Sequence, residues 1–190
     1  MIIGISGKLY SGKDTLASCL LHEFDDYGVT FMQKSFAFKL KKMGAYLTNT
    51  PEIWWFTQEG KQHYLPKWDM TIGEFQQKLG TEAMRDNIHP DGWVIALMSE
   101  YSTFDNWIVT DVRFPNEAEA IKKEGGILIR IDGDPSDGRK NSKRDLNHPS
   151  ETLLDNYDGF DYKILNVPPI EMLQKQAHTI AFNLLRSRIY

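Results

Sequence analysis

The sequence predicts an α/β fold built on a mostly parallel five-stranded sheet. Its 190 residues have the length of one compact domain, and 41% hydrophobic with 12% aromatic residues can supply a core. Short apolar runs alternate with longer amphipathic runs, which is typical of βα units. There is no internal repeat and no low-complexity linker, so we expect a single domain over residues 1–190.

Five short apolar segments predict the strands. Residues 1–6 are followed by glycines, as expected for a buried strand that ends in a turn. The segment 107–110 is similarly apolar and ends at Asp111. The other predicted strands span residues 29–33, 127–131 and 162–165.

Amphipathic spacing predicts the helices between these strands. Leu16, Leu20 and Phe24 recur every four residues and indicate a helix over residues 14–24. Further helices are expected over residues 36–47, from residue 71 to about residue 85, from residue 92 to about residue 101, over residues 115–124 and over residues 170–184. Residues 48–70 are rich in aromatics and least regular, whereas the polar, basic residues 132–149 predict a surface loop.

The bulk composition excludes several classes of function. A net charge of −4 gives no support for a broad surface that binds nucleic acid or membranes. The single cysteine, Cys19, offers neither an internal disulfide nor a metal cluster and suits a reducing cytoplasm. No signal peptide and no apolar run of about 20 residues is present, so we expect a soluble, cytoplasmic protein.

The strongest functional signal is the segment Gly7-Lys8-Leu9-Tyr10-Ser11-Gly12-Lys13, which matches the phosphate-binding pattern G-x-x-x-x-G-K. It lies between a predicted strand and a predicted helix, as that pattern requires. Glycines let backbone N–H groups point at phosphate oxygens, and the helix N-terminus adds a positive dipole. The segment predicts ATP binding through Gly7, Lys8, Ser11, Gly12, Lys13, Asp14 and Thr15.

The residue after the lysine departs from the common pattern. Asp14 stands where Ser or Thr usually binds Mg²⁺, and the hydroxyl comes one residue later, at Thr15. Asp14 could approach the ion directly or through water, while Thr15 could hold a phosphate. Asp111, at the end of a strand, could serve Mg²⁺ through water or orient the acceptor. We expect Mg²⁺ beside ATP, with Asp14, Thr15 and Asp111 as the candidate ligands.

Short length and the lack of the guanine-specifying pattern N-K-x-D favour a small-molecule kinase over a GTPase or motor ATPase. Phosphoryl transfer needs positive charge around the transferred group, so the arginines outside the loop are informative. Arg113 lies just past a strand end, where it could grip an anionic acceptor bidentately. The arginines before the C-terminal tail are Arg85, Arg113, Arg130, Arg139 and Arg144.

Several ordered blocks make the sequence resemble the bacteriophage deoxynucleoside monophosphate kinases, a branch of the nucleoside monophosphate kinase group. They run over about residues 1–155, and the Leu-Gly-Thr-Glu and Asp-x-Arg-x-x-Asn-Glu blocks are far more specific than the phosphate loop. The blocks are Ser6-Gly7 with Ser11-Gly12-Lys13-Asp14-Thr15, Ser35-Phe36-Ala37 with Leu40-Lys41, Gln77-Lys78-Leu79-Gly80-Thr81-Glu82 with Arg85, His89-Pro90-Asp91 with Trp93, Asp111-Val112-Arg113-Phe114-Pro115-Asn116-Glu117, and His148-Pro149-Ser150-Glu151.

The resemblance implies a three-layer P-loop kinase fold with helices on both faces of the sheet, an acceptor-binding region over about residues 36–105 and a mobile lid over about 132–149. It implies transfer of phosphate from ATP, with Mg²⁺, to deoxynucleoside monophosphates for phage DNA precursor synthesis in the host cytoplasm, by a homodimer. Its catalytic residues would be Lys13, Asp111, Arg113, Arg139 and Arg144. Lys140 and Lys143 would join the ATP site, and the acceptor would meet Lys34, Ser35, Arg85, Trp93, Arg113 and Glu151.

Three alternatives stay open at this stage. A phosphomevalonate-type kinase would share the phosphate loop and change the acceptor. A kinase acting on modified bases in phage DNA would need a basic groove, against which the charge of −4 counts. A nucleotide sensor without catalysis is disfavoured by the joint presence of Lys13, Asp111 and Arg113. His148 is expected to shape a turn and cap a helix rather than to contact a ligand.

Overall fold

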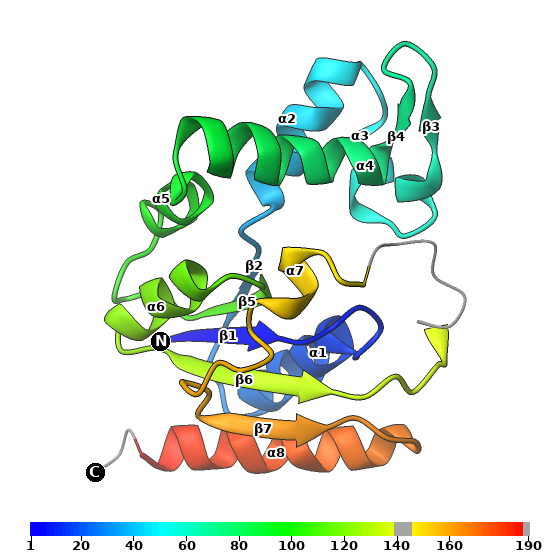
Figure 1. Ribbon diagram of the computed structural model, residues 1–190. Helices are drawn as coiled ribbons and strands as arrows, with labels where there is room; N and C mark the ends of the chain where they lie inside the picture. Colours follow the sequence, from blue (N-terminus) through cyan, green and yellow to red (C-terminus); the bar gives the residue numbers. More distant parts are fainter. Residues whose placement is uncertain (139–145, 188–190) are drawn as a thin grey trace. The chain divides into compact units, whose positions relative to one another are not determined.

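The computed structural model describes residues 1–138 and 146–187, and the chain divides into two compact units (Figure 1). The sheet unit comprises Met1–Lys34 and Ser102–Tyr190, and the inserted unit comprises Ser35–Tyr101. The inserted unit covers nearly the region expected to bind the acceptor. That assignment of function stays a prediction.

The sheet unit is built on five strands in the order β2-β5-β1-β6-β7, and every neighbouring pair is parallel (Figure 1). The strands are β1 (Ile2–Ser6), β2 (Met32–Lys34), β5 (Trp107–Val112), β6 (Ile127–Asp132) and β7 (Tyr162–Leu165). The central strand β1 is fully buried, and its Ile3 lies opposite Ile108 of β5 and Ile127 of β6. The predicted α/β class and five-stranded parallel sheet are confirmed.

Helices cover both faces of this sheet. On one face, α1 (Lys13–Asp26) and α8 (Ile170–Arg186) pack their apolar sides against β1, β5 and β6 in one buried cluster. On the other face lies α6 (Pro115–Lys123), whose Ile121 reaches so close to the sheet that a Cβ at Gly4 would lie 2.6 Å from its δ-methyl group. The three-layer arrangement of a P-loop kinase fold is therefore confirmed.

The inserted unit is mainly helical and has its own small core. Its elements are α2 (Phe38–Thr48), α3 (Glu52–Phe56), the short 3₁₀ helix η1 (Gly60–Gln62), the hairpin strands β3 (Tyr64–Leu65) and β4 (Met70–Thr71), α4 (Ile72–Gln77), the π-helix η2 (Lys78–Ile88) and α5 (Gly92–Met98). Trp55 is fully buried there and donates its indole N–H to Thr50 Oγ1 at 2.9 Å. Trp55, with Trp54 and Phe56 packed against its cluster, thus builds a core where the sequence indicated little regular structure, whereas Tyr64 and Trp68 are exposed.

Two elements differ from the predicted ones for identifiable reasons. The second strand begins at Met32 rather than at residue 29, because Phe31 turns into the core and stacks on Phe24 with ring centroids 4.2 Å apart. The helix expected from Thr71 does begin there, with a capping box in which Thr71 and Glu74 each accept a hydrogen bond from the other's backbone N–H. From Lys78 it continues as the π-helix η2. No helix of the described residues is long and apolar enough to cross a membrane.

Candidate active site

The loop between β1 and α1 is tightly curled, and two of its glycines are required by their surroundings. Gly12 has φ +91°, and a Cβ there would lie 2.3 Å from Asn166 Nδ2. A Cβ at Gly7 would lie 2.3 Å from the Ile131 carbonyl oxygen. Tyr10 is also left-handed, with φ +61°. This alternation of backbone conformation suits a concave phosphate-binding loop.

The loop's polar groups fit a polyphosphate. Lys13 Nζ donates to the carbonyl oxygens of Gly7 and Lys8, both at 2.7 Å, which places the ammonium group over the loop. Ser11 Oγ is fully buried and has no hydrogen-bond partner within the described residues. A lysine ammonium and the N-terminus of a 14-residue helix are groups that bind phosphate in proteins.

Asn166, which directly follows β7, forms a hydrogen bond with the loop. Its side-chain N–H donates to the Ser11 carbonyl at 3.0 Å, and its backbone N–H donates to the Asp132 carbonyl at 2.8 Å. The residue is 6% exposed. The loop is therefore fixed to the ends of β6 and β7, which are distant in sequence.

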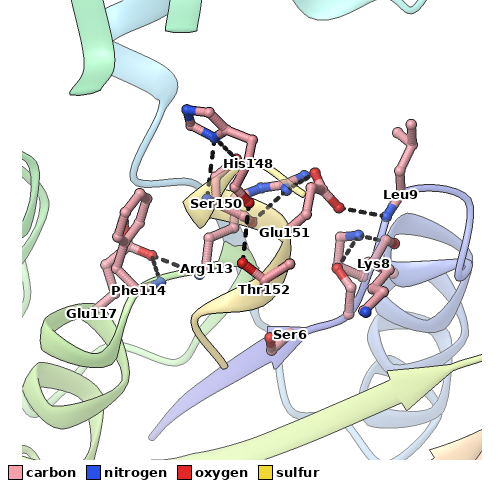
Figure 2. Close-up of polar contacts among 12 residues, drawn as sticks. Ser6, Lys8, Leu9, Arg113, Phe114, Glu117, His148, Ser150, Glu151 and Thr152 are labelled. Atoms are coloured by element: carbon pink, nitrogen blue, oxygen red, sulfur yellow. Dashed lines mark hydrogen bonds and ion pairs between the residues drawn. The ribbon is translucent and has the colours of Figure 1, made fainter. Parts of the chain in front are cut away.

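Arg113 leaves the sheet immediately after β5, beside the central strand. Ser6 at the end of β1 pairs with Val112, so the turn that carries Arg113 starts next to the phosphate loop. Glu117 Oε2 accepts the backbone N–H groups of Arg113 at 2.7 Å and Phe114 at 3.1 Å, and this fixes the start of α6 (Figure 2). Asp111 lies on β5 two residues before Arg113 and is partly buried.

Glu151 joins the loop to Arg113. Its Oε2 accepts the Leu9 backbone N–H at 2.9 Å, while its Oε1 accepts a hydrogen bond from Arg113 Nη1 (Figure 2). The same Nη1 donates to the Ser150 carbonyl at 3.0 Å. Glu151 lies on the short helix α7 (Pro149–Thr152), which His148 caps by accepting the Ser150 N–H at 3.2 Å. This is the capping role expected of His148.

A second acidic residue, which lies just after α7, also contacts the loop. Asp155 pairs through Oδ2 with Lys8 Nζ at 2.7 Å and through Oδ1 with Arg130 Nη2 at 2.9 Å. Arg130 is 7% exposed and also bonds Asp132 through Nε at 3.0 Å. Lys8, a predicted ATP ligand, is thus engaged in an ion pair here. Arg130 serves to connect β6 with the segment after α7.

The candidate metal ligands Asp14, Thr15 and Asp111 carry oxygen groups, which are the donors that Mg²⁺ prefers. Asp14 and Thr15 occupy the first turn of α1 and are exposed. Within residues 1–138 and 146–187, no group of three or more His, Cys, Asp or Glu side chains could hold a metal by itself. Mg²⁺ commonly takes only one or two carboxylates, with waters and substrate phosphates completing its shell. The oxygen groups of Asp14, Thr15 and Asp111 are compatible with an ion held mainly by nucleotide phosphates, and their role as ligands stays a prediction.

The residues predicted to bind the acceptor belong to both units: Lys34, Arg113 and Glu151 to the sheet unit, and Ser35, Arg85 and Trp93 to the inserted unit. In the sheet unit, Lys34 Nζ lies 4.6 Å from the centre of a Trp107 ring. In the inserted unit, Arg85 Nη1 donates to the Pro90 carbonyl at 3.1 Å, and Ser35 lies just before α2.

Trp93, also in the inserted unit, is 4% exposed and donates its indole N–H to the Gly80 carbonyl at 2.9 Å. Its burial favours packing over base stacking. The predicted lid residues Arg139, Lys140, Lys143 and Arg144 lie outside the described residues.

Comparison with curated proteins identifies the family. A protein of Acanthamoeba polyphaga mimivirus, named "Putative deoxynucleotide monophosphate kinase", is 34% identical over 194 aligned positions, which span 93% of each chain. The chain belongs to this nucleotide kinase family. The similarity covers both units of the kinase, and the relative comes from a mimivirus rather than a bacteriophage. No protein-family model matches the chain.

Sequence reasoning missed three polar residues of this kinase that shape the site. Asn166 and Asp155 hold the loop across separations of 155 and 147 positions from Ser11 and Lys8, so no local pattern marks them. Arg130 was noted only as one of few arginines. The available signal was position along the chain. Asn166 directly follows a parallel strand, Arg130 lies in the second half of one, and Asp155 lies in the segment after the His148 block.

Proposed function

We propose that the chain transfers the γ-phosphoryl group of ATP, with Mg²⁺, to deoxynucleoside monophosphates and so forms deoxynucleoside diphosphates. The family supports a nucleotide kinase. The observation that best supports the proposal is the attachment of Arg113 to the phosphate loop through Glu151, because an arginine held there would meet an anionic acceptor next to phosphates bound by the loop. The homodimer that the resemblance implies stays a prediction.

The chain's own residues would bind and orient both substrates. Loop N–H groups and Lys13 would hold the β- and γ-phosphates, and Arg113 would hold the acceptor phosphate for attack in line with the leaving group. Asp14, Thr15 and Asp111 are the residues that would hold Mg²⁺, which when bound neutralises charge on the phosphate oxygens. Because a monophosphate is already anionic at neutral pH, no general base is required.

Further predicted contacts complete this proposal. Ser35 and Arg85 would contact the acceptor from the inserted unit. The four basic residues between 139 and 144 would contact ATP phosphates and help to exclude water from the reaction. Alanine variants at these positions test each contact through the KM of the substrate concerned.

The direct test is a panel of acceptors assayed with ATP and Mg²⁺. The panel contains the four deoxynucleoside monophosphates, their ribonucleoside counterparts, phosphomevalonate and DNA with modified pyrimidines. We expect diphosphate formation with at least one deoxynucleoside monophosphate and none with phosphomevalonate or DNA. Turnover confined to phosphomevalonate or DNA, or ATP binding without any transfer, would show that the proposed acceptor is wrong.

A further inference from the structure

We infer that Glu151 is a positioning residue, which fixes the edge of the Arg113 guanidinium that the acceptor phosphate meets and ties that edge to the phosphate loop. This inference rests on the proposed function and deepens it. It replaces the expectation that Glu151 itself contacts the substrate, because the Glu151 side chain is 1% exposed and both its oxygens are engaged by protein groups.

The hydrogen bonds of Arg113 define which edge is presented. Its Nη1 carries two hydrogens, and both are used: one donates to Glu151 Oε1 and the other to the Ser150 carbonyl at 3.0 Å. Among the described residues, Nε and Nη2 donate to no partner, and the side chain is 21% exposed. Nε and Nη2 form the side-on fork that binds two oxygens of one phosphate. The contacts to α7 therefore leave this fork for the acceptor.

Only a carboxylate can meet the Leu9 N–H and Arg113 Nη1 with a separate acceptor oxygen for each. Leu9 N–H and Arg113 Nη1 are both donors, so each must meet an acceptor oxygen. A glutamine would offer one oxygen and one NH₂ group, and the NH₂ group would face a donor. The negative charge also matters, because the guanidinium beside it is only partly exposed and gains from a buried counter-charge.

The same contact removes one N–H from the phosphate site. The Leu9 N–H points to Glu151 in a buried hydrogen bond, so it is not one of the loop donors that receive ATP. Leu9 and Glu151 are 142 positions apart, and Arg113 and Glu151 are 38 apart. One side chain thus connects three separate segments: the phosphate loop, the turn after β5 and α7 (Figure 2).

Kinetics of Glu151→Gln test this role, with Glu119→Gln as the matched control. Glu119 is on α6 and accepts a hydrogen bond from the Tyr157 hydroxyl at 2.6 Å, outside the site. We expect Glu151→Gln to lower kcat/KM for the acceptor about tenfold to a hundredfold, while the Kd for an ATP analogue changes less than about threefold. Glu119→Gln should match the wild type. A value for Glu151→Gln within about twofold of the wild type would overturn the inference.

A double-mutant cycle with Arg113→Lys separates positioning from general stability. Lysine has no fork, so Glu151→Gln should cost less than about threefold in kcat/KM in that background. Equal losses in both backgrounds would show that Glu151 is only structural. Glu151→Asp, which keeps the charge but shortens the side chain, should retain more activity than Glu151→Gln. The opposite order would contradict the inference.

The wild-type protein supplies a readout that needs no variant and no acceptor. The Leu9 amide should be protected from hydrogen exchange, and its NMR shift should change less on binding an ATP analogue than the shifts of Gly12 and Lys13. Fast exchange of Leu9, or a shift as large as theirs, would overturn the inference. Because no acceptor is added, this result stands even if the proposed acceptor is wrong.

Discussion

Replacing Gly12 with alanine perturbs the phosphate loop at its most crowded point. The backbone there has φ +91°, where an L-residue is strained by about 1–2 kcal/mol. The added Cβ would lie 2.3 Å from Asn166 Nδ2, so the carboxamide must move away. That movement breaks the buried hydrogen bond to the Ser11 carbonyl, and an unsatisfied buried group costs about 1–3 kcal/mol. The sum predicts a loss of about 2–5 kcal/mol in the free energy of unfolding.

Gly125→Ala is the matched control, because Gly125 also has a left-handed φ, +68°, but lies in open space. Apart from its chain neighbours, no heavy atom of the described residues lies within 4 Å of the position that a Cβ there would take. The variant should lose only the strain, about 1–2 kcal/mol. Urea unfolding followed by circular dichroism measures both values. Since the loop N–H groups depend on this geometry, Gly12→Ala should also weaken binding of an ATP analogue, whereas Gly125→Ala should not.

The crowding can be tested separately in an Asn166→Ala background. Removing the carboxamide removes the atom that the new Cβ would meet, so the additional cost of Gly12→Ala should fall to that of Gly125→Ala. If Gly12→Ala lowers the free energy of unfolding no more than Gly125→Ala does in the wild-type background, the contact between residue 12 and Asn166 is not tight. The account of how β7 holds the loop would then be refuted.

Three further outcomes are expected. Arg113→Lys keeps a positive charge but loses the fork, so it should raise the acceptor KM or lower kcat about tenfold or more while ATP-analogue binding is unchanged. The exposed Arg186→Lys is the control. An effect of Arg113→Lys on ATP binding alone would contradict the role assigned to Arg113. Thr71→Ala removes the cap of α4 and should lower the free energy of unfolding by about 1 kcal/mol in urea titrations, with no change meaning that the cap is dispensable. Burial, with the hydrogen bond to Glu119, raises the pKa of Tyr157 from 10 to about 12. The folded state therefore keeps a proton that the unfolded state loses, so the associated stability is complete below pH 10 and is lost as pH rises towards 12. Tyr157→Phe should reduce the decrease of the free energy of unfolding between pH 10 and 12. If the wild type and the variant show the same dependence on pH, the role assigned to Tyr157 is wrong.

Local patterns in the sequence predicted most of the sheet unit. The strand over residues 162–165 and the phosphate loop between β1 and α1 follow from short apolar runs, glycines and helical spacing, all of which act over a few residues. Phe31 shows the limit of such patterns: its apolar character predicted strand, but it packs on Phe24 before the β-ladder begins. Tertiary packing decided that boundary.

The contacts that shape the site were beyond local reasoning. Glu151 stood out through a motif, yet its contacts with Arg113 and Leu9 span 38 and 142 positions, and pairings at such distances leave no periodic signal. For Trp93, residue type did not indicate the contact that the structure shows. This aromatic lies in the region expected to bind the acceptor, but it is buried and donates a hydrogen bond to the Gly80 carbonyl. Residue type indicated the chemistry, and the fold determined which groups face one another.

Transfer of label from ATP tests the central claim most directly. With γ-labelled ATP, Mg²⁺ and a deoxynucleoside monophosphate, the label should appear in the β-position of the diphosphate, with one ADP formed for each transfer. Lys13→Ala should abolish this transfer with an unchanged circular dichroism spectrum, whereas the exposed Lys123→Ala should retain it. Failure of the wild type to label any deoxynucleoside monophosphate, or near-normal transfer by Lys13→Ala, would contradict the account.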